Sequence, residues 1–183
     1  MNATPAAVPV VELREFTRAD AVTLLAWVGG PAELLTWAGP AFSWPLDEAQ
    51  LAAYSREALG VRRIWTAVEP GSGEAIGHAS LRVDAVHRRA RLGRVLVAPH
   101  ARGRGLGVAM LTEVLTRAFG SGDVDRVELG VFTHNTRAIR LYERLGFTSD
   151  TVLPDVEHVD GRPWSAMQMS LGRPDRADGR QRS

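Results

Sequence analysis

The order of expected elements places this chain in the α/β class, with a central mixed, mostly antiparallel sheet and helices on both faces. Three observations predict this fold. Short strands separated by glycine-containing turns come first, which is typical of antiparallel hairpins. A strand, helix, strand, helix, strand series follows, which is typical of parallel pairing. Residues 105–119 carry apolar side chains at helical spacing, so one face of that helix is expected to pack against the sheet.

The N-terminal part predicts one strand and a helical excursion. Residues 10–16 alternate well enough for a first strand. Glycine and proline residues, together with a capping-box-like start at Asp47, then delimit the helical segments. The expected helices run from Thr17 or Asp20 to Trp27, over residues 32–37 and over residues 47–60.

The rest of the chain predicts the sheet and its two later helices. Strands are expected at 63–68, 75–83, 90–97, 126–132, 147–153 and 164–171, with helices at 105–119 and 135–145. Asp160 and Gly161 form the turn between the last two strands.

Length and composition bound the domain organisation. A chain of 183 residues suits one domain, expected over residues 10–171. Residues 1–9 and the arginine-rich tail 172–183 are expected to be flexible. The absence of cysteine excludes disulfides, thiolate catalysis and cysteine-ligated metals, and no metal site is expected.

Charge and hydropathy restrict the partners. The formal net charge is +1, which argues against general nucleic-acid binding. No stretch approaches the roughly 20 apolar residues of a membrane span, and the N-terminus does not resemble a secretion signal. We expect a cytoplasmic monomer or homodimer. Seven arginines between Arg82 and Arg104, with Asp84 as the one acid among them, could meet an anionic ligand or form a solvated strand edge.

Residues 97–107 predict a phosphate-binding loop. They end a strand, turn through Gly103, Gly105 and Gly107, and open the helix of residues 105–119. Unpaired N–H groups at a helix N-terminus stabilise phosphates where glycine lets the ligand approach the backbone. A nucleoside-triphosphate loop requires lysine, and the chain has none. The spacing also fails the dinucleotide fingerprint, because neither Val108 nor Met110 supplies its last glycine.

Two ordered motifs identify a family resemblance. Arg102-x-x-Gly105-x-Gly107 resembles the acetyl-CoA pyrophosphate motif of the GNAT superfamily of N-acetyltransferases. Residues 135–147, with Asn135, Tyr142 and a closing Gly-Phe, are similar to the late helix of the same superfamily. The resemblance extends over about residues 64–171. It implies a GNAT-like fold in which strands 90–97 and 126–132 splay apart, with the pantetheine arm of the cofactor in the gap.

The resemblance also implies an activity. Acetyl-CoA would be the cosubstrate, and its acetyl group would pass directly, in a ternary complex, to a primary amine of a small molecule, peptide or protein. The lack of cysteine supports direct attack, since no cysteine nucleophile is present to carry the acetyl group. A non-catalytic acyl-CoA-binding or sensing module is the alternative, because no obvious general base is present.

The cofactor residues follow from the two motifs and the strand that precedes the loop. Backbone N–H groups of the loop would bind the pyrophosphate, two arginines would add charge, and backbone groups at the strand end would pair with pantetheine. The expected cofactor residues are Leu96, Val97, Arg102, Gly103, Arg104, Gly105, Leu106, Gly107, Asn135 and Tyr142. Asn135 has two open roles, since its amide can cap the helix or contact the ligand.

Acetyl transfer needs a proton for the departing thiolate and removal of a proton from the amine. Tyr142 matches the family tyrosine and is expected to protonate the thiolate. Strand 90–97 carries no carboxylate, so the base is open. Glu128 and Asp84 could act through a water, His78 and His134 belong to the residue type that exchanges protons near neutral pH, and bulk water is a further acceptor.

The early helices are expected to border the acceptor site. Trp37, Phe42 and Trp44 could line an apolar pocket. Glu33 or Asp47 could attract the ammonium group of an amine.

Overall fold

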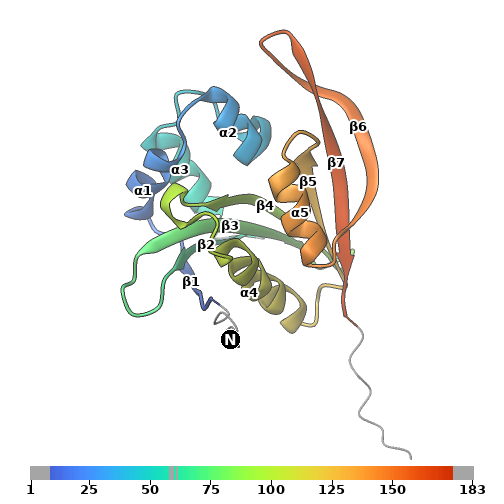
Figure 1. The fold of residues 1–183 in the computed structure, drawn as a ribbon. Helices are drawn as coiled ribbons and strands as arrows, with labels where there is room; N and C mark the ends of the chain where they lie inside the picture. The colour runs from blue at the N-terminus through green and yellow to red at the C-terminus, as the bar shows by residue number, and fades with distance from the viewer. Residues whose placement is uncertain (1–8, 58–59, 61, 175–183) are drawn as a thin grey trace, which may run out of the picture.

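The computed structural model describes residues 9–57, 60 and 62–174, and this part of the chain contains a seven-stranded sheet with the order β1-β2-β3-β4-β5-β7-β6 (Figure 1). The strands are β1 (Glu12–Glu15), β2 (Arg62–Val68), β3 (Ala75–Asp84), β4 (Arg89–Val97), β5 (Arg126–Phe132), β6 (Thr148–Val159) and β7 (Arg162–Gly172). The helices are α1 (Asp20–Trp27), α2 (Pro31–Ala38), α3 (Glu48–Arg56), α4 (Leu106–Gly120) and α5 (Thr136–Arg144), with 3-10 turns η1 (Gly39–Ala41) and η3 (Pro99–Ala101).

The sheet is incompletely paired in its middle, between β4 and β5. Every neighbouring pair is antiparallel except β4 and β5, which are parallel. These two strands pair only through Arg89 with Arg126, Ala90 with Val127 and Arg91 with Glu128. Beyond those pairs β4 and β5 no longer pair, as the family resemblance implied. A gap therefore lies between their C-terminal halves.

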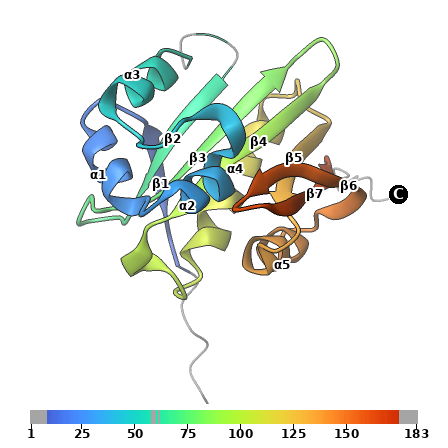
Figure 2. The same ribbon diagram turned by 90° about the horizontal axis from the view of Figure 1, so that it is seen from above.

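Helices cover both faces of the sheet, which confirms the predicted fold class. The ribbon places α1, α2 and α3 on one face and α4 on the other, with α5 in front of β5 (Figures 1 and 2). The predicted stripe of α4 is buried, and Met110, Leu111 and Val114 lie in the core cluster shared with the sheet. A second cluster joins α1, α2 and α3 through residues such as Leu24 and Leu51. Two cores on opposite faces hold the sheet between them.

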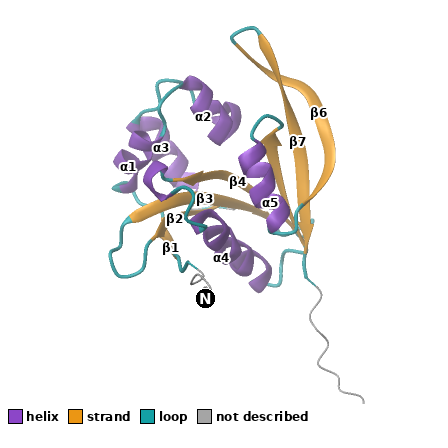
Figure 3. Ribbon diagram, in the orientation of Figure 1, coloured by secondary structure: helices purple, strands orange, loops and turns teal. Residues whose placement is uncertain are grey.

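The elements differ from the expected ones mainly at their ends. The first strand is shorter than predicted, and α3 ends at Arg56, while residues 58–59 of the predicted helix lie outside the described residues. The closing hairpin is longer than predicted and extends beyond the body of the molecule (Figure 3). Its first strand continues past Pro154 because the pairing shifts between Leu153 and Glu157, which removes the ladder bond that proline cannot donate.

The chain ends fall largely outside the described residues. Of the segments predicted to be flexible, only Pro9 and residues 172–174 are described. Gly172 closes β7, and the backbone N–H of Arg173 donates to the carbonyl of Asp125 at 2.7 Å. No single helix of the described residues has the length and apolar composition to cross a membrane, and α1 with the run Pro31–Ala41 meets that test only as a pair bent by 116°.

Candidate active-site cleft

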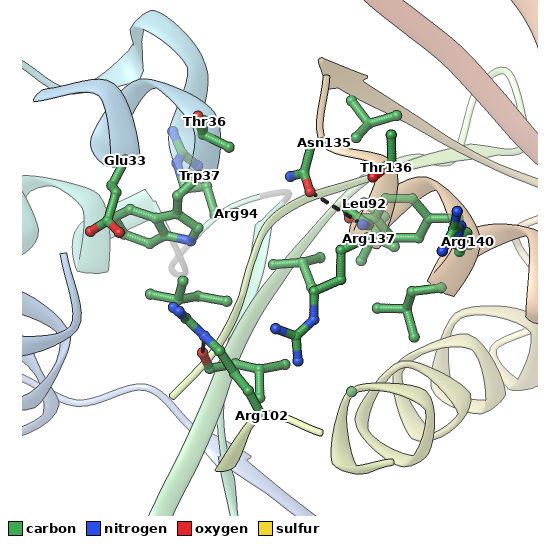
Figure 4. A pocket seen from close by; sticks show the side chains of 18 of the residues that line it. Glu33, Thr36, Trp37, Leu92, Arg94, Arg102, Asn135, Thr136, Arg137 and Arg140 are labelled. Carbon is green, nitrogen blue, oxygen red and sulfur yellow. Dashed lines mark hydrogen bonds between the residues drawn. The ribbon is translucent and has the colours of Figure 1, made fainter. Parts of the chain in front are cut away.

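A cleft of about 860 Å³ lies where β4 and β5 separate. Its base is the C-terminal half of β4, Leu92 to Val97, with Gly130 and Val131 of β5. Figure 4 shows Glu33, Thr36, Trp37 and Arg94 on one side, and Asn135, Thr136, Arg137 and Arg140 on the other. The loop before α4 closes one end. The cleft therefore contacts both the predicted phosphate loop and the N-terminal helices.

The phosphate loop has the backbone conformation that its glycines predict. Gly103 and Gly105 have φ values of 81° and 78°, a region that glycine adopts readily and other residues rarely do. Gly105 precedes α4 and provides no side-chain cap, while its carbonyl accepts from the N–H groups of Val108 and Ala109. The N–H groups of Leu106 and Gly107, at the first turn, precede that hydrogen-bonding ladder. Gly103, Gly105, Leu106 and Gly107 all line the cleft.

The two loop arginines point to different partners. Arg102 lines the cleft, and its Nε donates to the carbonyl of Val97 at 3.2 Å. Arg104 is not among the lining residues, because its Nη2 pairs with Glu69 at 2.6 Å. Only one of the two cations predicted to contact the cofactor thus lies in the cleft.

Gly107 allows three elements to meet. A Cβ built on Gly107 would lie 3.3 Å from Cγ2 of Val97 and 3.5 Å from Cδ2 of Leu141. A larger side chain would push α4 away from β4 and α5, so this glycine contributes to packing as well as to the loop.

The end of β4 exposes one backbone edge to the cleft. Leu96 and Val97 line the cleft and pair on their other side with His78 and Gly77 of β3. Their pairing with β5 ends well before them, at Arg91. The free edge can accept hydrogen bonds from an extended ligand, as a sheet accepts another strand.

Helix α5 carries two of the predicted residues, Asn135 as its N-cap and Tyr142 in its last turn. Oδ1 of Asn135 accepts from the N–H of Ala138 at 3.2 Å, so the asparagine caps the helix while it also lines the cleft. The Tyr142 ring is buried against Phe147, with ring centroids 5.8 Å apart. Burial raises the pKa of the Tyr142 phenol above its ordinary value, so the phenol stays protonated at neutral pH.

Two of the candidate proton acceptors are carboxylates outside the cleft lining. Glu128 pairs with Arg89 at 3.1 Å and with Arg126 at 3.3 Å. Asp84 pairs with His87 at 2.8 Å, at the exposed turn between β3 and β4. Both carboxylates therefore have side-chain partners outside the cleft lining.

The two candidate histidines differ in position. His78 is buried outside the cleft lining, and its Nε2 lies 3.0 Å from the hydroxyl of Tyr54. Burial, together with the like charge of Arg94, lowers the pKa of His78 to about 3. His134 lines the cleft, with its ring centroid 5.6 Å from Phe132 and 4.2 Å from Trp164. Of the four named candidates, His134 alone belongs to the cleft lining.

Of the predicted acceptor residues, some line the cleft and others lie outside its lining. Glu33 and Trp37 line the cleft, and Oε2 of Glu33 accepts from the N–H of Gly29 at 2.7 Å. Phe42 stacks on Trp37 at 5.7 Å and supports it without joining the lining. Trp44 is 47% exposed and also lies outside the lining. Asp47 caps α3 by accepting from Gln50 N at 2.8 Å.

Sequence reasoning missed several side chains of the cleft. Arg94 was one of seven clustered arginines that a solvated strand edge also explains, yet it is half-buried in the lining. Its signal was Gly93, since glycine inside a strand often marks a bulge. The β3–β4 register shifts at this point, and Arg94 has a φ of 52°. The arginines of α5 were also missed, although their spacing places them on one helical face: Arg137, Arg140 and Arg144.

No group of three or more His, Asp or Glu side chains within the described part of the chain is arranged to hold a metal ion.

Comparison with known proteins identifies the family. Residues 32–147 match the acetyltransferase (GNAT) family. The uncharacterized N-acetyltransferase YoaA of Bacillus subtilis (strain 168) is 28% identical over 124 residues, which cover 67% of this chain and 68% of YoaA. Spermidine N(1)-acetyltransferase of Vibrio cholerae serotype O1 is 27% identical over 105 residues, covering 57% of this chain and 60% of that protein.

A solved structure shares the fold. The crystal structure of spermidine N-acetyltransferase from Vibrio cholerae in complex with CoA and spermine superposes with a TM-score of 0.78 at 19% identity, covering 88% of this chain and 95% of that chain. The predicted class of enzyme and its cosubstrate, acetyl-CoA, are confirmed by the family match. With its family match extending from α2 to the end of α5, this chain belongs to the acetyltransferase (GNAT) family.

Proposed function

We propose that this enzyme transfers the acetyl group of acetyl-CoA to a primary amine by direct attack in a ternary complex. The observation that carries the proposal is one continuous cleft, which joins the glycine loop before α4 to the gap between β4 and β5. One volume of about 860 Å³ has room for a cofactor arm and an acceptor that meet inside it.

The cofactor is proposed to enter along the loop and β4. The backbone of Gly103, Gly105, Leu106 and Gly107 would bind the diphosphate, aided by the positive end of α4. The pantetheine arm would then pair with the free edge of Leu96 and Val97. This path leads the thioester toward the middle of β4.

The chemical step is balanced by two proton transfers. The neutral amine nitrogen attacks the thioester carbonyl, a C–N bond forms and the C–S bond breaks. The amine loses a proton and the departing thiolate gains one, which leaves an acetamide and CoA with a free thiol. Holding both reactants in one cleft supplies much of the rate enhancement, because the attack becomes effectively intramolecular.

Tyr142 is proposed to protonate the thiolate. The residue lines the cleft, and its buried environment favours the protonated phenol. His134 is proposed to take the proton from the amine, directly or through a water, because it belongs to the cleft lining. The ion pairs of Glu128 direct it toward Arg89 and Arg126, so the proposal gives it no part in proton removal.

Acetylation of an amine panel tests this function. The purified chain would be mixed with acetyl-CoA and with amino acids, their amides, short peptides or spermidine, while release of free thiol is followed. Calorimetry with CoA would run in parallel. We expect saturable thiol release with at least one class of amine. CoA binding without thiol release across the whole panel would contradict the proposal and favour a non-catalytic acyl-CoA module.

A further inference from the structure

The α2 side of the cleft holds a half-buried arginine. Arg94 is half-buried in the lining, and its guanidinium carbon lies 4.4 Å from the ring centroid of Tyr54 and 5.2 Å from that of Phe42. None of the ion pairs found among residues 9–57, 60 and 62–174 involves Arg94. Its Nε is buried and has no hydrogen-bond partner there.

The two aromatic rings hold this cation in place. Cation–π contacts offset part of the cost of burying a guanidinium, and they fix its planar face. Burial lowers the pKa of Arg94, yet an arginine side chain keeps its proton in proteins. A charged, oriented guanidinium that forms no ion pair within the described part of the chain is suited to bind a carboxylate through two parallel hydrogen bonds.

A second donor at the same side points to the same chemistry. Nε1 of Trp37 is buried and without a partner among the described residues, although Trp37 lines the cleft. Trp37 stacks on Phe42, the ring that also carries the guanidinium of Arg94. Figure 4 places Trp37 and Arg94 on the same side of the cleft, across from Asn135. This side therefore offers two hydrogen-bond donors to a ligand that brings acceptors.

The phosphates of the cofactor are too distant to be that ligand. Arg94 precedes Val97 by three residues, roughly 10 Å along a strand at about 3.3 Å per residue. The glycine loop lies beyond Val97, so the diphosphate would sit farther away still. The proposed cofactor path leads the thioester toward the middle of β4, so an acceptor that enters between α2 and β4 would reach Arg94.

The charges of the lining also select against polycations. Among the described residues, five arginines line the cleft, whereas Glu33 is the one carboxylate there, and Glu33 already accepts from Gly29. A polyamine would meet repulsion at Arg94 and find one acidic partner. From these contacts we infer that the acceptor is a small amino carboxylate, whose carboxylate pairs with Arg94 while its amine faces the thioester. The inference rests on the proposed acetyl transfer and narrows its substrate class.

Matched acceptors test this specificity without any mutation. Initial rates would be compared for L-amino acids, for the corresponding amides and for spermidine, all at saturating acetyl-CoA. We expect kcat/KM at least about tenfold higher for the carboxylate than for its amide, with spermidine poorest. Equal rates for acids and amides would overturn the inference while leaving acetyl transfer in place. Failure to release thiol with any acceptor would instead remove the proposed function itself.

Variants of Arg94 separate carboxylate binding from other roles. In Arg94→Gln the KM for the amino acid should rise at least about tenfold, with kcat on the amide and CoA affinity changed less than about twofold. Arg94→Lys should retain part of the preference, because it keeps the charge without the planar fork. Arg91→Gln is the control, since Arg91 is exposed on the same strand and contacts Gln168 outside the lining. An equal loss of kcat on acids and amides would overturn the inference in favour of a role in the chemical step.

Discussion

Tyr142 depends on its hydroxyl for the proposed chemistry and on its ring for packing, so the two contributions can be separated. In Tyr142→Phe the ring remains against Phe147 and only the proton donor is lost. We expect kcat to fall about 100-fold or more, the usual range for general acid catalysis, with CoA affinity changed less than about twofold. Steady-state kinetics and calorimetry provide the measurement. Unchanged turnover would remove Tyr142 from its proposed role.

Gly105 combines an unusual backbone conformation with a crowded position. Its φ is 78°, and a Cβ there would lie 3.3 Å from Cγ of Pro9. Gly105→Val should strain the loop and block approach of the diphosphate, which weakens CoA binding at least about tenfold. Gly172→Ala is the matched control, because its Cβ meets no atom within 4 Å. Calorimetric titration that finds equal affinities in both variants would contradict the phosphate loop.

His78 makes stability depend on pH. Its pKa is about 3 in the folded protein, below the ordinary value of 6.5, so the unfolded chain binds the proton more readily. The stability that His78 contributes is complete above about pH 6.5 and is lost as the pH falls toward 3.

A comparison of variants isolates this effect. Urea unfolding of the wild type between pH 6.5 and 4 should show stability falling with a slope of up to about 1.4 kcal/mol per pH unit from this residue. His78→Gln should flatten the profile, whereas His158→Gln, at an exposed position, should leave it unchanged. Parallel profiles for the wild type and His78→Gln would contradict the assignment.

The packing of α4 on β3 has little tolerance for added volume. A Cβ on Gly77 would lie 2.7 Å from Sδ of Met110 and 3.0 Å from the carbonyl of Leu96. Gly77→Ala should therefore lower the free energy of unfolding by about 1–3 kcal/mol. Denaturant unfolding measures the loss. Adding Met110→Ala should make the combined cost less than the sum of the single costs, since one of the two clashes disappears. Strict additivity would show that helix and strand do not compete for this space.

The register shift between β3 and β4 decides where the side chain of Arg94 lies. In a regular edge strand an arginine points to solvent. The clustered arginines around Arg94 in the sequence are compatible with such a solvated strand edge. The register shift between His78 and Ser80 instead places Arg94 among Phe42 and Tyr54. Helical spacing was a more reliable guide for α4, because its apolar stripe is a local property of the sequence.

Ligand binding should stabilise the whole molecule, because the cleft is formed by elements from both halves of the chain. Acetyl-CoA at about 100 times its dissociation constant should add about 2.7 kcal/mol to the free energy of unfolding. For a domain of this size that corresponds to an increase in melting temperature of roughly 5–11 °C. ATP and NAD at the same concentration should give smaller shifts, and equal shifts would contradict selectivity for CoA. A thermal melt with each ligand measures this.

The order of strands and helices, the glycine loop and the cap at Asn135 could all be predicted, since each depends on residues close together in the chain. Local backbone preferences and helical periodicity encode such features directly. The length of the closing hairpin could not be predicted, because Pro154 ends a strand unless the pairing shifts around it. The partners of Arg104 and Glu128 also escaped prediction, since Glu69 and Arg89 are remote in sequence.

The sequence alone was enough to identify the GNAT family, because each of its two motifs is a contiguous segment whose backbone conformation depends on neighbouring residues. Which side chains line the cleft depends on the tertiary structure. Folding separates β4 from β5 and brings α2 and α5 to opposite sides of the gap (Figure 4). Which charges face one another there depends on long-range packing and on desolvation. For that reason the half-buried position of Arg94 in the cleft, and with it the inferred acceptor class, came from the three-dimensional arrangement.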